Sequence, residues 1–332
     1  MSLPPLFIVA SERSGTNLLR KRLTEKQDTY YGVEPAHFLK HLYHHQPFYG
    51  SFSDDQNFIT MIKDAIKLCK LHFAPWDIEF EAKEIFSEYD SIYSYRNVFG
   101  VMDYMMKRYA ISKGYKTYIC KDNFLFDYLY QIKAYLEPVK FIYLYRDPRD
   151  VVLSQTKRRF GDQSIVNNAK LWRSEQVKSF QLFQDFFKDD CFLISYEDFI
   201  KDEENSLKQI FSFLGTEEAE SENFYEEFVE AHDWKNLNKP TLKNNFGKYK
   251  TELSSKQIKL IETICHQEMG LLGYELQYET TSFSTFFLAW RSLRGKISRR
   301  LRVKLLKYLK TDQVKEKRLK RRRFVSKFRH PN

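Results

Sequence analysis

A short polar stretch near the start of the chain carries the residue types that bind anions. The letters "SERSGTN", residues 11–17, follow the apolar run Leu6–Ala10 and precede a segment with helical spacing. Backbone N–H groups in a loop before a helix attract negative charge. The stretch is close to the G-x-x-x-x-G-K-[ST] phosphate loop, but Ala10 replaces its first glycine, Thr16 its lysine and Asn17 its hydroxyl. We therefore expect a phosphate-binding loop that does not hold a nucleoside triphosphate with Mg²⁺.

The same loop carries a cation and a glycine. Arg13 lies at its tip, where a guanidinium can pair with an anionic leaving group without a metal. Gly15 frees the backbone, so that the N–H groups from Ser14 to Leu18 can point at a phosphate. The alternative is a glycine turn that only opens a helix.

A second stretch, "YRDPRDVVLS", has the same order of strand, polar turn and helix. The run Val139–Tyr145 is typical of a buried strand, Asp147 is a predicted N-cap and Pro148 takes the first helical position. Arg146 ends the strand, and Ser154 follows it by about two helical turns. An arginine fork and a hydroxyl at this spacing can hold a phosphate. Two anion sites on one sheet suit a ligand with two separated phosphates.

The elements that must position these residues alternate between strands and helices. Strands are expected at 6–10, 116–121, 139–145 and 191–195, and helices at 15–23, 165–187, 203–214 and 254–269. This order predicts an α/β, P-loop-like, three-layer fold in which helices flank a doubly wound parallel sheet. The stretch from about 41 to 115 reads as a helical insertion that could wall the acceptor site. We expect one domain over 1–280 and a tail over 281–332.

Composition limits the classes of partner. The chain of 332 residues has a net charge of +10, but the segment from residue 291 onward holds 18 lysines and arginines against two acidic residues, which leaves −6 for the rest. The basic charge belongs to the tail, so the domain is not expected to bind nucleic acid. The chain starts without the features of a signal peptide, and no apolar run is long enough to span a membrane. Its four cysteines are too widely spaced for a metal site and read as free thiols of a cytoplasmic protein.

Four motifs in the right order resemble the sulfotransferase family. They are "RSGT", "YRDPRDVVLS", "SYEDFIKDEENSLKQIFSFLG" and "FGKYKTELSSKQIKLIETICHQEMGLLGYEL". The resemblance runs with gaps from Leu6 to about Leu276. It implies a donor, 3′-phosphoadenosine 5′-phosphosulfate (PAPS), whose product is adenosine 3′,5′-bisphosphate, and it implies no metal. By this resemblance the loop residues bind the 5′-phosphosulfate; these are Arg13, Ser14, Gly15, Thr16 and Asn17.

The other motifs imply contacts to the rest of the donor. Arg146 and Ser154 match the residues that bind the 3′-phosphate, and Tyr196 matches a tyrosine near the adenine. Lys248 and Lys250 fall in the late segment that is similar to the family's closing loop.

The usual catalytic base of the cytosolic members is missing. Where those enzymes have K-T-H, this chain has Lys121, Asp122 and Asn123. Lys121 stays a candidate for the site because it ends a predicted strand. Other branches of the family take a glutamate after the first helix, and here that segment offers Glu34 before Pro35, which favours extended backbone.

Histidines close to Glu34 provide a second candidate base. His37 lies three residues after the glutamate, and its spacing to His41 and His44 suits one face of a helix. A shared histidine face could suggest a metal, but no carboxylate or cysteine cluster supports one. We predict Glu34 as the base, with His37 in reserve, and Arg13 and Lys121 as catalytic cations.

The tail reads as a basic amphipathic helix. Five apolar residues recur at steps of four between lysines and arginines: Leu293, Ile297, Leu301, Leu305 and Leu309. Such a helix either docks on the domain or lies on an anionic membrane surface, and both alternatives stay open.

The sequence favours an enzyme that moves a sulfuryl group to a hydroxyl of a carbohydrate or lipid-linked acceptor. The chain is expected to be cytoplasmic, either free or at the inner face of a membrane. The alternatives are a P-loop nucleotide kinase and a noncatalytic adenine-nucleotide binding module at a membrane.

Overall fold

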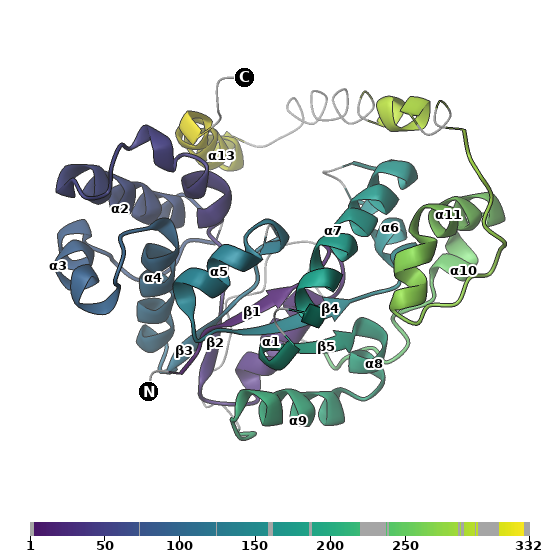
Figure 1. Cartoon of the computed structure of the whole chain (residues 1–332), viewed down its shortest axis with the longest axis horizontal. Coiled ribbons are helices and arrows are strands. Elements are labelled where there is room, and N and C mark those ends of the chain that lie inside the picture. The colour runs from purple at the N-terminus through teal and green to yellow at the C-terminus, as the bar shows by residue number, and fades with distance from the viewer. Residues whose placement is uncertain are drawn as a thin grey trace.

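The chain folds around one parallel sheet, shown in Figure 1. The computed structural model describes residues 3–72, 74–123, 125–158, 162–185, 188–219, 237, 239–284, 286, 289–295, 297 and 312–328. Five strands pair in the order β2-β3-β1-β4-β5, and every pair is parallel. Their bounds are β1 Leu6–Val9, β2 Tyr30–Val33, β3 Thr117–Cys120, β4 Lys140–Tyr145 and β5 Cys191–Ser195. The predicted α/β fold is confirmed, with β2 as a strand that the sequence did not reveal.

Alternating side chains of the strands enter two cores, as expected for a sheet covered on both faces. Leu6 and Ile8 point to the face covered by α1 (Thr16–Glu25), α8 (Tyr196–Lys201) and α9 (Glu203–Leu214). Phe7 and Val9 point to the other face, where the insertion and α5 (Leu129–Leu136) pack. The sheet is therefore the middle of three layers.

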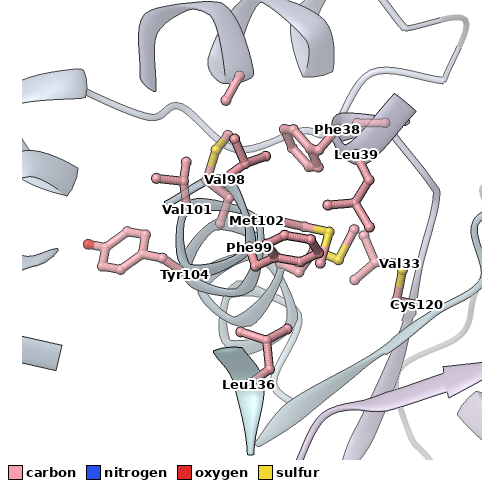
Figure 2. Packing of buried hydrophobic residues seen from close by; sticks show 14 of the residues in the cluster. Val33, Phe38, Leu39, Val98, Phe99, Val101, Met102, Tyr104, Cys120 and Leu136 are labelled. Atoms are coloured by element: carbon pink, nitrogen blue, oxygen red, sulfur yellow. The ribbon is translucent and has the colours of Figure 1, made fainter. Parts of the chain in front are cut away.

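The insertion between β2 and β3 is helical, as predicted. It contains a π-helical turn (Leu39–Tyr43), a 3₁₀ turn (Gln46–Phe48), α2 (Asp55–Lys70), α3 (Ala82–Ile92) and α4 (Val98–Ser112). Figure 2 shows α4 packing with Val98, Phe99 and Met102 near Phe38, Leu39, and the strand ends Val33 and Cys120. This core fixes the segment that follows β2 against the carboxyl edge of the sheet.

Four helices that follow β4 in the chain pack together in the second half of the domain. They are α6 (Pro148–Thr156), α7 (Ile165–Asp185), α10 (Tyr249–Glu252) and α11 (Ser255–Leu271). Asp147 caps α6 by accepting a hydrogen bond from the Arg149 N–H, and Pro148 is its first residue, as predicted. Trp172 of α7 and Ile261 of α11 are fully buried in one cluster with Val152 of α6. Figure 1 places these helices at the opposite end of the sheet from α2, α3 and α4.

The tail is described in part. Leu301, Leu305 and Leu309 of the predicted amphipathic helix lie outside the described residues. Beyond them, α13 (Asp312–Val325) and a 3₁₀ turn (Ser326–Phe328) lie next to α2, visible above it in Figure 1. Phe328 is buried, and its ring contacts that of His45 at 5.0 Å between centroids. This part of the tail docks on the insertion.

Within the described residues no helix combines the length and the apolar character needed to cross a membrane. The four cysteines, Cys69, Cys120, Cys191 and Cys265, are free and buried. Burial raises the pKa of the Cys120 thiol above its ordinary value, which fits an unreactive core residue.

Candidate active site

The loop after β1 has a strained backbone that only a few residue types accept. Arg13 and Gly15 have φ values of 78° and 92°, both in the left-handed region. A Cβ atom on Gly15 would lie 2.4 Å from a ring carbon of Tyr196, so the glycine is required by the close approach as well as by the dihedral. We call residues 10–15 the anion loop. It delivers the chain directly into α1, which begins at Thr16.

The anion loop and the β4–α6 turn contact each other through their cationic side chains. Arg13 Nε donates to Ser154 Oγ at 3.0 Å, and Arg146 Nη1 donates to the Arg13 carbonyl oxygen at 3.0 Å. The Arg146 guanidinium also lies over the Tyr196 ring, 4.1 Å from its centroid. Such stacking orients a planar cation. The structure thus brings together two stretches that the sequence separates by more than 130 residues.

These residues line one cavity of about 500 Å³. We call it the anion cavity, and it has the size of a small-molecule site. Nine of the predicted site residues line it: Arg13, Gly15, Thr16, Asn17, Lys121, Arg146, Ser154, Tyr196 and Lys248. Ser14 lies in the loop with its side chain fully buried. Lys250 lines a different cavity beside Asp147 and Glu197.

Three buried polar atoms of the anion loop, of α1 and of the β4–α6 turn have no hydrogen-bond partner in the described part of the chain. They are Ser14 Oγ, Asn17 Oδ1 and Arg146 Nε. A buried donor or acceptor without a partner costs free energy, so natural structures rarely keep several at one place without a ligand to satisfy them. The side chains therefore fit a ligand rich in phosphate oxygens, which would accept from Ser14 and from Arg146.

A late loop, residues 245–249, closes one side of the anion cavity. The buried carboxylate of Asp150 accepts from the N–H of Gly247 at 2.5 Å and from the N–H of Tyr249 at 3.0 Å. Asn245 Nδ2 donates to the Tyr196 hydroxyl at 2.7 Å. These bonds hold Lys248 at the cavity wall. Asp150 and Asn245 are site residues that the sequence did not single out, although Asp150 belongs to the second motif and Asn245 directly precedes the fourth.

Glu34, the predicted base, lies in a buried ion pair. Its Oε2 is 2.6 Å from Nη2 of Arg20, a side chain that is fully buried on α1. Burial raises the pKa of Glu34, but the charges of Arg20 and Lys121 and the hydrogen bond from Arg20 outweigh it, so the pKa lies below its ordinary value. Glu34 is not among the residues that line the anion cavity.

His37 contacts a carboxylate. Its Nδ1 is 2.9 Å from Oδ1 of Asp122, which follows β3 by two residues. Lys121 and Asn123, the neighbours of Asp122 in the chain, both line the anion cavity. Burial, together with the charge of Arg20, lowers the pKa of Lys121, although the charges of Glu34 and Asp122 oppose this. Like Glu34, His37 and Asp122 are not among the residues that line the anion cavity, but they lie next to the part of its wall that Lys121 and Asn123 form.

The predicted shared histidine face is wrong for His37. The residue has a φ of 61° and precedes the π-helical turn that begins at Leu39, so it cannot share a helix face with His41 and His44. The left-handed backbone of His37 itself keeps it out of the helical turn that follows. Burial lowers the pKa of His41 to about 3, with nearby positive charges adding to the effect. Among the described residues no cluster of three or more histidines, cysteines or carboxylates could hold a metal ion.

The comparisons with known proteins agree with this arrangement. The model of the sulfotransferase family matches residues 4–220, which is more than half of the chain. No curated protein matches. This chain belongs to the sulfotransferase family.

Solved structures show the same fold. The sulfotransferase domain of the olefin synthase from Synechococcus PCC 7002 superposes with a TM-score of 0.57 at 19% identity, covering 83% of this chain and 97% of that one. The sulfotransferase domain from the curacin biosynthetic pathway gives 0.51 at 17% identity, covering 83% and 100%. The protein is a sulfotransferase, and the alternatives of a nucleotide kinase and of a noncatalytic module fall away.

Proposed function

We propose that this sulfotransferase uses PAPS as its donor and transfers the sulfuryl group in line to a hydroxyl of a carbohydrate or lipid-linked acceptor. The observation that carries the donor assignment is the pair of buried donors beside the anion cavity that have no partner among the described residues, Ser14 Oγ and Arg146 Nε. Arg146 donates to the carbonyl oxygen of Arg13, and the side chain of Arg13 donates to Ser154, so two cations lie together at this place.

In this proposal each side chain has one task. Arg13 and the N-terminus of α1 stabilise the charge that develops on the 5′-phosphate, and Lys121 adds positive charge from the β3 side. Arg146 and Ser154 bind the 3′-phosphate, while Tyr196 lies against the adenine. Lys248 closes the cavity over the nucleotide, whereas Lys250 acts at longer range. The donor itself supplies an activated sulfuryl group, so no metal is needed for the chemistry.

The acceptor is proposed to enter from the insertion, because His37, Asp122 and Glu34 lie on that side of the strand ends. We assign residues 1–280 to the catalytic domain and 281–332 to a tail that binds an anionic membrane surface. The exposed side chains of Lys320, Arg322 and Arg323 on α13 support the second assignment.

Calorimetry with two nucleotides tests the donor. Adenosine 3′,5′-bisphosphate should bind without Mg²⁺ and far more tightly than AMP. Replacing Arg146 with Lys should weaken the bisphosphate by about ten- to 150-fold, since a charged hydrogen bond contributes about 1.5–3 kcal/mol. The variant should change AMP affinity much less. Equal affinity of the native protein for both nucleotides would contradict the donor assignment.

A further inference from the structure

His37 is held in an unusual backbone conformation next to a carboxylate. A φ of 61° is uncommon for any residue with a side chain. Such conformations persist only where the surroundings enforce them, and they gather at functional sites. The result here is a hydrogen bond of 2.9 Å between His37 Nδ1 and Asp122 Oδ1, which joins the segment after β2 to the segment after β3.

The residues around His37 show what enforces this conformation. Ala36 and Phe38, on either side of it, are buried at 0% and 1% exposure. The Phe38 ring meets Trp76 edge-on at 5.7 Å, and Trp76 Nε1 donates to the Glu34 carbonyl oxygen at 2.9 Å. Figure 2 shows Phe38 within the same core as Val33 at the end of β2. The imidazole is therefore placed by a packed framework, while its own side chain keeps 22% exposure.

Glu34 has a different set of contacts, which suit a structural role. Arg20 is fully buried and donates to Glu34 Oε2 and to the Val33 carbonyl oxygen, both at 2.6 Å. A buried guanidinium needs a carboxylate partner, and a carboxylate committed to that partner is a weak proton acceptor. A general base works best with a pKa close to the operating pH, and the pKa of Glu34 is shifted the other way, below its ordinary value.

We propose that His37 is the base for the acceptor hydroxyl and that Asp122 is its positioning residue, with Glu34 serving as the counterion of Arg20. This inference rests on the proposed function. The Asp122 carboxylate accepts from Nδ1–H, and in this tautomer the lone pair of the imidazole lies on Nε2, the atom that takes the proton of the acceptor. As the acceptor O–H bond breaks, its proton moves to Nε2 and its oxygen forms a bond to sulfur. The bond between sulfur and the 5′-phosphate oxygen breaks, and that oxygen keeps the electron pair.

The role of Asp122 makes a sharp prediction for the Asp122→Asn variant. An asparagine side chain can donate to Nδ1, which then forces the proton onto Nε2 and blocks the base. Turnover should fall by about a hundredfold to ten-thousandfold, as for loss of a general base, and His37→Gln should fall by a similar factor. The affinity for adenosine 3′,5′-bisphosphate should stay within about twofold in both variants.

The tautomer of His37 can be measured without an acceptor. In the native protein, ¹⁵N NMR of labelled histidine should show a protonated Nδ1 and a bare Nε2 for His37, with the signal assigned by its loss in His37→Gln. In Asp122→Asn the pattern should reverse. A purely packing role for Asp122 would leave the tautomer unchanged. The matched control is His266→Gln, because His266 Nδ1 lies 3.0 Å from the Thr263 carbonyl oxygen of its own helix, α11.

The outcomes separate this inference from the donor assignment. If the bisphosphate does not bind the native protein, the proposed function fails. If it binds, but native His37 carries its proton on Nε2, or Asp122→Asn keeps near-normal turnover, the base assignment is wrong. A loss of turnover in Glu34→Gln as large as in His37→Gln, in protein that is folded and binds the bisphosphate, would return the role to Glu34.

Discussion

A single glycine fixes the geometry of the anion loop. Gly15 combines a left-handed backbone with a close approach to Tyr196, and the tyrosine in turn carries the guanidinium of Arg146 on its ring. One residue type therefore controls both the loop and the cation beside it.

The two demands on Gly15 can be separated by a matched pair of variants. Gly15→Ala should destabilise the protein and lower bisphosphate affinity at least tenfold, because its Cβ displaces the Tyr196 ring. Gly215→Ala has the same left-handed strain at a φ of 67°, but its Cβ would meet nothing within 4 Å. Left-handed backbone costs about 1–2 kcal/mol for a residue with a side chain. Gly215→Ala should therefore show this loss of stability in chemical denaturation, with native bisphosphate affinity. Equal affinities in the two variants would contradict the Tyr196 contact.

The ion pair between Glu34 and Arg20 should govern stability at acid pH. The pKa of Glu34 is lowered in the folded state, so its contribution is present above the ordinary pKa of 4.5 and is lost as pH falls through the folded value. Glu34→Gln leaves a buried guanidinium without a counterion, which should cost about 3 kcal/mol at pH 7. The gap between native and variant in urea unfolding should shrink below pH 4.5. A gap that stays constant down to pH 3 would show that the pair does not contribute as a charge.

One side chain of α6, that of Asp150, holds the late loop in place. Asp150 is 2% exposed and accepts two backbone N–H groups of that loop, those of Gly247 and Tyr249. Lys248 is therefore held at the wall of the anion cavity by a carboxylate that lies almost a hundred residues earlier in the chain.

Asp150→Asn should loosen the late loop and leave the domain folded. The amide has one acceptor oxygen in place of two, so at least one of the two backbone bonds is lost. Amide hydrogen exchange at Gly247 and Tyr249 should quicken about ten- to a hundredfold, and bisphosphate affinity should fall several-fold. Ser254→Ala is the control, because it removes a helix cap of α11 that does not hold the late loop. Unchanged exchange in Asp150→Asn would rule out the anchoring role.

The elements that the sequence predicted well are those with local signals. The cap and proline at Asp147 and Pro148 locate α6, and the apolar runs locate β1 and β4. The strand β2 was not predicted, because it has only four residues and includes Gly32, a poor strand former. Gly32 is explained only by the fold, because a Cβ there would lie 2.6 Å from Cγ of Arg20.

The site was predictable to the same extent. Residues inside motifs could be placed, whereas the partners of Glu34 and His37 could not. Arg20 pairs with Glu34, and Asp122 with His37, through tertiary contacts. A basic residue on a helix or an aspartate after a strand carries no local sequence pattern that would predict such a partner. Asp122 was visible at a strand end, but nothing in the sequence aimed it at His37.

At the scale of the whole molecule, the described end of the tail, residues 312–328, contacts the helical insertion of the domain. Arg321 Nη1 donates to the Leu71 carbonyl oxygen at 3.4 Å, and Lys327 forms an ion pair with Asp64 of α2. Phe328 is buried beside His41 and His45. One side of α13 is therefore used for docking, while Arg322 and Arg323 stay exposed on the molecule. The alternatives of docking and membrane binding were posed for the helix that carries Leu293 to Leu309, much of which lies outside the described residues. Beyond that helix, α13 docks on the domain and still exposes basic side chains.

Charge on the exposed side of α13 should control membrane association without affecting the domain. The triple variant Lys320→Gln, Arg322→Gln, Arg323→Gln should lose about a hundredfold in affinity for vesicles rich in phosphatidylserine, since each basic residue near such a surface adds about 1 kcal/mol. A second triple, Lys83→Gln, Lys208→Gln, Lys256→Gln, changes the net charge equally from exposed sites on α3, α9 and α11 and should float like the native chain. Both triples should keep native bisphosphate affinity, because none of these side chains lines the anion cavity. If the two triples lose vesicle binding equally, attraction is set by net charge alone, and if the native chain does not float, the membrane proposal is wrong.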